Sequence, residues 1–138
     1  MDIYLDIDGV ILGTYSPLED CIEFLEYLLV HFPDTTYWLT THCKGGENHT
    51  GESLSRIYQS ELVDKIEATF KETDWGVLKT DAIDFSRPFV WFDDTLYQSE
   101  KMVLTQHGAE DGYYKIDPED PEAIKRALDH LRQIKKAQ

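Results

Sequence analysis

The chain has 138 residues, of which 41% are hydrophobic and 29% are charged. This composition excludes a disordered chain and is typical of a single folded domain, here residues 1–138, with a buried hydrophobic core. The formal net charge of −14 repels a phosphate backbone and argues against nucleic acid as a partner. The basic residues near the C-terminus are mixed with acids along a predicted helix, as on a solvated face. They are Lys125, Arg126, Arg132, Lys135 and Lys136.

The two cysteines, Cys21 and Cys43, are too few for a disulfide framework. No basic segment precedes the first apolar run, so we expect no secretory signal peptide. No run of apolar residues is long enough to cross a bilayer. We therefore expect a cytoplasmic protein that has no membrane partner.

The stretch at residues 3–11 is apolar apart from Asp6, Asp8 and Gly9. Its pattern predicts a buried strand that delivers two carboxylates to its carboxyl end, where open α/β sheets bind ligands. Gly9 allows a sharp turn directly after Asp8. Two carboxylates this close repel each other unless they share a proton or a cation, and Mg²⁺ prefers oxygen ligands. A strand that simply ends in two solvated acids would have the same short pattern.

An amphipathic helix is predicted from residue 16 or 17 to about residue 31, and a strand over residues 35–40. The strand ends in the hydroxyls of Thr40 and Thr41, which serve either as turn residues or as donors to an anion. The polar segment 42–51 is predicted to be a loop, either a mobile lid or an exposed connection.

His42, Cys43 and His49 lie in this loop and could be written as zinc ligands. Their spacing matches no structural zinc pattern, and a fourth ligand is missing. We therefore expect no zinc site here.

The remaining elements are predicted from apolar periodicity and turn residues, and strands alternate with helices. This alternation favours a Rossmann-like, doubly wound parallel α/β sheet of about five strands, with helices on both faces. The predicted elements are a helix at 51–63, a short strand at 66–70, a helical turn or two at 75–82, a strand at 88–92, a helix at 95–107, a strand at 113–116 and a helix at 121–136.

Polar groups end three of the predicted strands, and Lys79 lies just upstream of the third. These groups are Asp6 with Asp8, Thr40 with Thr41, and Asp93 with Asp94. A parallel sheet brings its strand ends together, so four acids, a threonine and a lysine can surround Mg²⁺ and a phosphoryl group. An aspartate can then attack phosphorus, while a second carboxylate protonates the leaving oxygen and activates water.

These residues resemble the four motifs of the haloacid dehalogenase (HAD) superfamily of phosphohydrolases. Residues 3–11 resemble the first motif, a strand ending in D-x-D-G-[TV]-[LI], and residues 38–40 resemble the second, a strand ending in Thr or Ser. Lys79 resembles the third motif, and residues 90–94 resemble the acidic fourth. The motif order and the alternation of strands and helices match over nearly the whole chain.

The resemblance implies a Mg²⁺-dependent phosphatase that forms an aspartyl-phosphate. Asp6 would be the nucleophile, and Asp8 would be the general acid and base, with its backbone carbonyl on the metal. Asp93 would ligate Mg²⁺ together with Asp6, and Asp94 would ligate it directly or through water.

The second and third motifs imply the groups that hold the phosphoryl oxygens. These would be Thr40 and Lys79, with Thr41 as the alternative if the strand ends one residue later.

The resemblance also implies a member without a cap domain, because residues 9–17 and 41–79 leave no room for one. An open site of this kind in the family serves phosphorylated substrates, including large ones, or is closed by a partner subunit in an oligomer. Two other functions share some of these features: a receiver-like signalling domain, in which the acidic residues come in a different order, and a binding module that keeps the fold without catalysis.

Overall fold

The computed structural model describes residues 1–46 and 48–138. Its centre is an all-parallel sheet in the order β2-β1-β3-β4. The strands are β1 (Asp2–Leu5), β2 (Thr36–Trp38), β3 (Phe89–Asp93) and β4 (Tyr113–Lys115). The prediction of an α/β protein with a parallel sheet is confirmed. The described residues form four strands, however, where we predicted about five.

The register of the sheet brings the ends of its inner strands together. Leu5 pairs with Trp38 of β2 and with Phe92 of β3. The backbone N–H of Asp6 then donates to the Phe92 carbonyl oxygen at 3.1 Å. Asp6 and Asp93, the next residues along β1 and β3, are therefore neighbours across the sheet.

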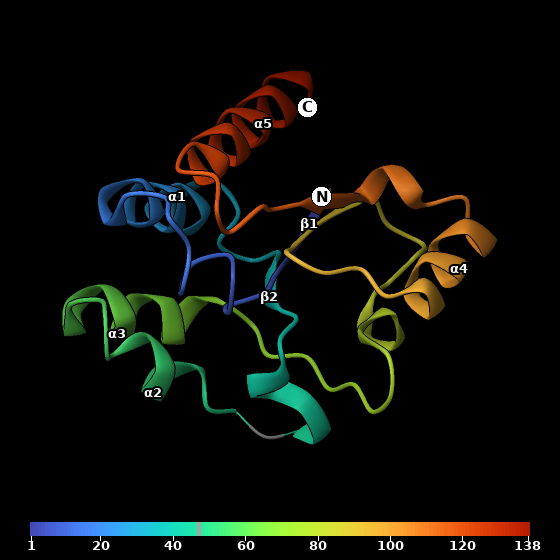
Figure 1. The fold of residues 1–138 in the computed structure, drawn as a ribbon, viewed down its shortest axis with the longest axis horizontal. Helices are drawn as coiled ribbons and strands as arrows, with labels where there is room; N and C mark the ends of the chain where they lie inside the picture. Colours follow the sequence, from blue (N-terminus) through green and yellow to red (C-terminus); the bar gives the residue numbers. More distant parts are fainter. Residues whose placement is uncertain (47) are drawn as a thin grey trace.

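Alternating side chains divide the core into two layers, because successive residues of a strand point to opposite faces. Ile3 and Leu5 pack with Phe92 against α1 (Leu18–His31) and α5 (Ala123–Ala137). On the other face, Tyr4 and Trp91 pack with Leu104 of α4 (Gln98–Gln106). Figure 1 shows α1 and α5 together on one side of the strands and α4 on the other, so helices cover both faces as predicted.

The missing strand is the main departure from the predicted elements. The predicted helix at 51–63 is two helices, α2 (Thr50–Leu54) and α3 (Ser60–Thr69), and α3 includes most of the predicted strand at 66–70. Val63, Ile66 and Phe70 are spaced to lie on one side of a helix, and all three are buried. Next to β2, Lys71 makes a single isolated parallel bridge with Tyr37 and does not extend into a strand.

Three short 3₁₀ helices complete the described structure: η1 (Thr41–Gly46), η2 (Lys79–Ala82) and η3 (Glu110–Gly112). The first lies within the segment predicted to be a loop, and the second is all that forms of the helical turns predicted at 75–82. The helix predicted at 95–107 is α4, and Gly108 follows it with a φ of 62°. No helix among the described residues combines the length and apolarity that a membrane crossing requires.

Candidate functional site

Three carboxylates gather at the carboxyl ends of β1 and β3. Asp6 and Asp93 are buried and Asp94 is half-buried. Each offers an oxygen atom, and these three atoms lie within 4.8 Å of one another. The register of the sheet causes this arrangement, because Asp6 directly follows β1 and Asp93 ends the neighbouring β3. Closely spaced carboxylate oxygens are the ligands that a hard divalent cation takes.

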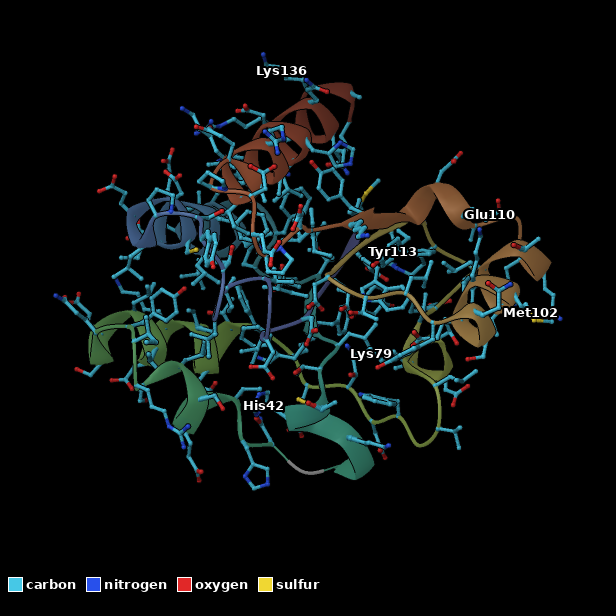
Figure 2. The ribbon with its side chains drawn as sticks, viewed as in Figure 1. His42, Lys79, Met102, Glu110, Tyr113 and Lys136 are labelled. Atoms are coloured by element: carbon cyan, nitrogen blue, oxygen red, sulfur yellow. The ribbon has the colours of Figure 1, made fainter. Side chains whose placement is uncertain are left out.

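Lys79 supplies the positive charge nearest to these carboxylates. Its Nζ lies 2.6 Å from Asp93 Oδ2 and 3.3 Å from Asp6 Oδ2, and its side chain is 12% exposed. Figure 2 shows Lys79 between the strands and α4. The backbone N–H of Lys79 donates to Glu100 Oε2 at 3.3 Å, and Glu100 Oε1 accepts from the N–H of Tyr97 at 3.1 Å. Glu100, buried at the start of α4, thus fixes the start of η2.

Asp93 is held by donors on both of its oxygens. The indole Nε1 of Trp91 donates to Oδ2 at 3.2 Å, and the backbone N–H of Thr95 donates to Oδ1 at 3.2 Å. Asp6 is similarly fixed, because its Oδ1 accepts from the N–H of Ile7 at 2.8 Å. These bonds orient both carboxylates toward Lys79 and leave little freedom of rotation.

Burial dominates the electrostatics of the site. It raises the pKa of Asp6, and it raises the pKa of Asp93 to about 6, with the charge of Asp6 adding to the effect. Burial also raises the pKa of Asp94. For Lys79, burial opposes the charged form, but the charges of Asp6 and Asp93 outweigh it and raise the pKa. Three carboxylates face one ammonium, so a further cation would be favoured here.

The two threonines after β2 occupy different positions. Thr40 is fully buried and its hydroxyl contacts the Asp6 carboxylate. Thr41 is exposed and lines the hollow above the carboxylates. Of the two residues that the sequence leaves open, Thr40 is the one beside Asp6.

A hollow of about 340 Å³ opens over these groups. Its inner wall holds Asp6, Lys79 and Asp93, and its outer wall includes Val77 and Tyr97. Both of these apolar side chains are largely exposed. The hollow could hold a phosphoryl group at its base, with the rest of a substrate at its mouth. A larger hollow, of about 610 Å³, lies at the other end of the strands beside Asp2 and Thr35, away from the carboxylate cluster.

Asp8 lies at the rim and does not join the carboxylate cluster. Its side chain is 67% exposed and Oδ2 lies 3.1 Å from Nε2 of His42. Of the four acids expected at the metal, the structure thus brings three side chains together and turns the fourth aside. The chain turns at Gly9, which has a φ of 77°, as its position after Asp8 predicts.

The residues considered as zinc ligands have other surroundings. Besides Asp8, His42 contacts Ser53, whose Oγ lies 3.0 Å from Nδ1. Cys43 is buried in the core, and this burial raises the pKa of its thiol to about 11. Cys21 is also buried in the core. That these residues bind no zinc stays a prediction.

Glu100, Trp91 and the His42–Ser53 pair contact the site residues although no motif in the sequence marks them. These contacts join segments that are distant in sequence, or depend on the direction in which a side chain points, and neither can be predicted from local sequence. Comparison of the chain with protein-family models, with curated proteins and with solved structures finds no match. The candidate function therefore depends on the geometry of the site and on the motifs of the sequence.

Proposed function

We propose that the protein is a Mg²⁺-dependent phosphomonoester hydrolase of the HAD superfamily that acts through an aspartyl-phosphate. The observation that carries this proposal is the meeting of Asp6, Asp93 and Asp94 with Lys79 in one hollow at the strand ends. The position of β1 between β2 and β3, whose ends carry the residues of the second and fourth motifs, supports it further.

The donor set fits Mg²⁺. Its carboxylate oxygens are hard ligands, two of the three acids are buried, and the single charge of Lys79, which pairs with Asp6 and Asp93, does not balance theirs. When bound, Mg²⁺ would offset the repulsion between the carboxylates and the phosphoryl oxygens. Asp6, Asp93 and Asp94 are the residues that would hold it.

In the proposed reaction, a carboxylate oxygen of Asp6 attacks phosphorus and the bond to the leaving oxygen breaks. Lys79 Nζ and the Thr40 hydroxyl hold phosphoryl oxygens, whose charge is redistributed during transfer. Asp8 gives its proton to the leaving oxygen, and its carboxylate then takes a proton from the water that hydrolyses the aspartyl-phosphate. The exposed position of Asp8 at the rim suits a group that must reach both the leaving oxygen and water.

Turnover of p-nitrophenyl phosphate tests this proposal. The purified protein should hydrolyse it with Mg²⁺, lose the activity in EDTA and regain it when Mg²⁺ is restored in excess. Asp6→Asn should reduce kcat to background, and Asp84→Asn, a change of an exposed aspartate away from the site, should not. Full activity in EDTA, or in Asp6→Asn, would contradict the proposal. A receiver-like domain or a binding module would show no steady turnover.

A further inference from the structure

Three segments meet around His42, beside the hollow that Asp8 borders. Asp8 follows β1, His42 lies in η1, the next element after β2, and Ser53 belongs to α2. The imidazole of His42 bridges the other two, with Nε2 3.1 Å from Asp8 Oδ2 and Nδ1 3.0 Å from Ser53 Oγ. His42 is labelled in Figure 2. Its side chain is 24% exposed, much less than that of Asp8.

Donor and acceptor roles follow from the chemistry of the groups. A carboxylate oxygen only accepts, so Nε2 of a neutral imidazole must carry the hydrogen when it donates to Asp8. Nδ1 is then an acceptor, and the hydroxyl of Ser53 can donate to it. The Asp8 carboxylate thereby selects the tautomer, and the Ser53 hydroxyl supports it by donating to Nδ1.

The contact also makes the two oxygens of Asp8 unequal, because only Oδ2 is paired with His42. Nε2 of His42 contacts Oδ2 of Asp8. Asp8 borders two hollows, the one above Asp6 and a smaller one of about 240 Å³ that His42 and Ser53 also line. An exposed aspartate next to a glycine turn would otherwise sample several rotamers. Anchoring Oδ2 on the His42 side leaves Oδ1 for a leaving oxygen above Asp6.

We propose that His42 is a positioning residue: it holds Asp8 so that Oδ1 can pass a proton to the leaving oxygen, and Ser53 holds His42. The inference rests on the proposed phosphatase function and adds to it. In the step concerned, the bond from phosphorus to the leaving oxygen breaks as the proton on Asp8 Oδ1 moves to that oxygen. His42 keeps its own hydrogen throughout.

The dependence of rate on the leaving group tests this role. Substituted phenyl phosphates whose phenols range from acidic to weakly acidic need increasing protonation of the leaving oxygen. In His42→Ala, kcat/KM should change little for the most acidic phenol and should fall by about 10- to 100-fold for the least acidic, because misplacement of a catalytic group has costs of that order. His42→Gln, which retains a donor, should recover part of this loss, and Ser53→Ala should show a smaller loss of the same kind.

Two controls separate positioning from damage to the fold. The rise in melting temperature caused by Mg²⁺ should be kept in all three variants, because His42 and Ser53 are outside the carboxylate cluster. His31→Ala, which removes an exposed histidine at the end of α1, should leave the leaving-group dependence unchanged.

The possible outcomes distinguish the positioning role from the phosphatase proposal. If His42→Ala lowers kcat/KM equally for every ester, or does not lower it at all, the positioning role is wrong. Turnover by the wild-type protein would still support the phosphatase proposal. If wild type hydrolyses no phosphate ester with Mg²⁺, the phosphatase proposal itself fails and this inference fails with it. If His42→Ala does not fold, the comparison of His42→Gln and Ser53→Ala with wild type decides on the same criterion.

Discussion

Asp93 has a raised pKa although three donors surround its carboxylate. Its carboxylate accepts hydrogen bonds from Lys79, Trp91 and Thr95, yet burial and the charge of Asp6 still raise its pKa to about 6. The hydrogen bonds therefore do not fully replace the water that the carboxylate loses on folding. A divalent cation would supply the missing stabilisation, and in the metal-free protein we expect Asp93 to take up a proton as pH falls through about 6.

The pH dependence of stability should report this preference. The pKa of Asp93 is about 6 in the folded protein and about 3.9 in an unfolded chain, so the folded state binds more protons between these values. In EDTA, the free energy of unfolding should therefore rise as pH falls from 7.5 to 5, and this contribution should be lost as pH rises through about 6.

Asp93→Asn isolates the effect from that of the other acids. As pH falls from 7.5 to 5, the free energy of unfolding of wild type should rise by on the order of 1–2 kcal/mol more than that of the variant. Urea unfolding at each pH measures this difference. Parallel pH profiles for the two proteins would show that Asp93 titrates normally.

At the scale of elements, the turn after β1 is packed against the carboxylate cluster. Gly9 has a φ of 77°, and a Cβ at this position would overlap the Asp94 carboxylate. Gly13, in the same connection, has a φ of 71° with no atom within 4 Å of such a Cβ. The two glycines share a left-handed backbone conformation but differ in what surrounds them.

Alanine at these two positions separates backbone strain from displacement of Asp94. Both Gly9→Ala and Gly13→Ala should destabilise the protein by about 1–2 kcal/mol, because a Cβ is unfavourable in this conformation. Only Gly9→Ala should also weaken Mg²⁺ binding, by roughly tenfold or more, since it displaces a proposed ligand. Calorimetric titration with Mg²⁺ would measure this, and equal affinities in the two variants would contradict it.

Some of these elements could be predicted from the sequence and others could not. The strands before Asp6, Thr40 and Asp93 are predictable because each is a short apolar or β-branched run bounded by polar residues. The run at 66–70 is also short and contains β-branched and aromatic residues, but Ile66 and Phe70 continue a helical spacing from Val63, and α3 extends to Thr69. The direction of Asp8 was not predictable, because β1 ends at Leu5 and the turn, not strand alternation, orients the side chain.

For the whole molecule, the formal net charge of −14 makes any bound cation favourable through long-range attraction. A specific site must therefore be distinguished from general screening. Within the described residues, Asp6, Asp93 and Asp94 are the one group of three or more side chains whose spacing could hold a metal ion. Specific binding of Mg²⁺ should therefore depend on these three residues, whereas general screening should not.

Mg²⁺ should consequently raise the melting temperature of the folded protein. A ligand at 100 times its dissociation constant stabilises the native state by about 2.7 kcal/mol. Thermal unfolding should show this shift in wild type, with sodium chloride at matched ionic strength as the control for screening. Asp93→Asn should lose most of the shift, and an equal shift in that variant would count against the site.

The most direct measurement of the central claim is the location of a phosphoryl group on the enzyme. Acid-quenched protein incubated with p-nitrophenyl phosphate and Mg²⁺ can be analysed by mass spectrometry for one added phosphoryl group. Asp6→Asn should carry none, because its nucleophile is gone. Asp8→Asn should accumulate the phosphoenzyme on Asp6, because this activated leaving group needs little protonation and no base remains to activate water. A phosphoenzyme in Asp6→Asn, or wild-type steady-state turnover in Asp8→Asn, would contradict the account.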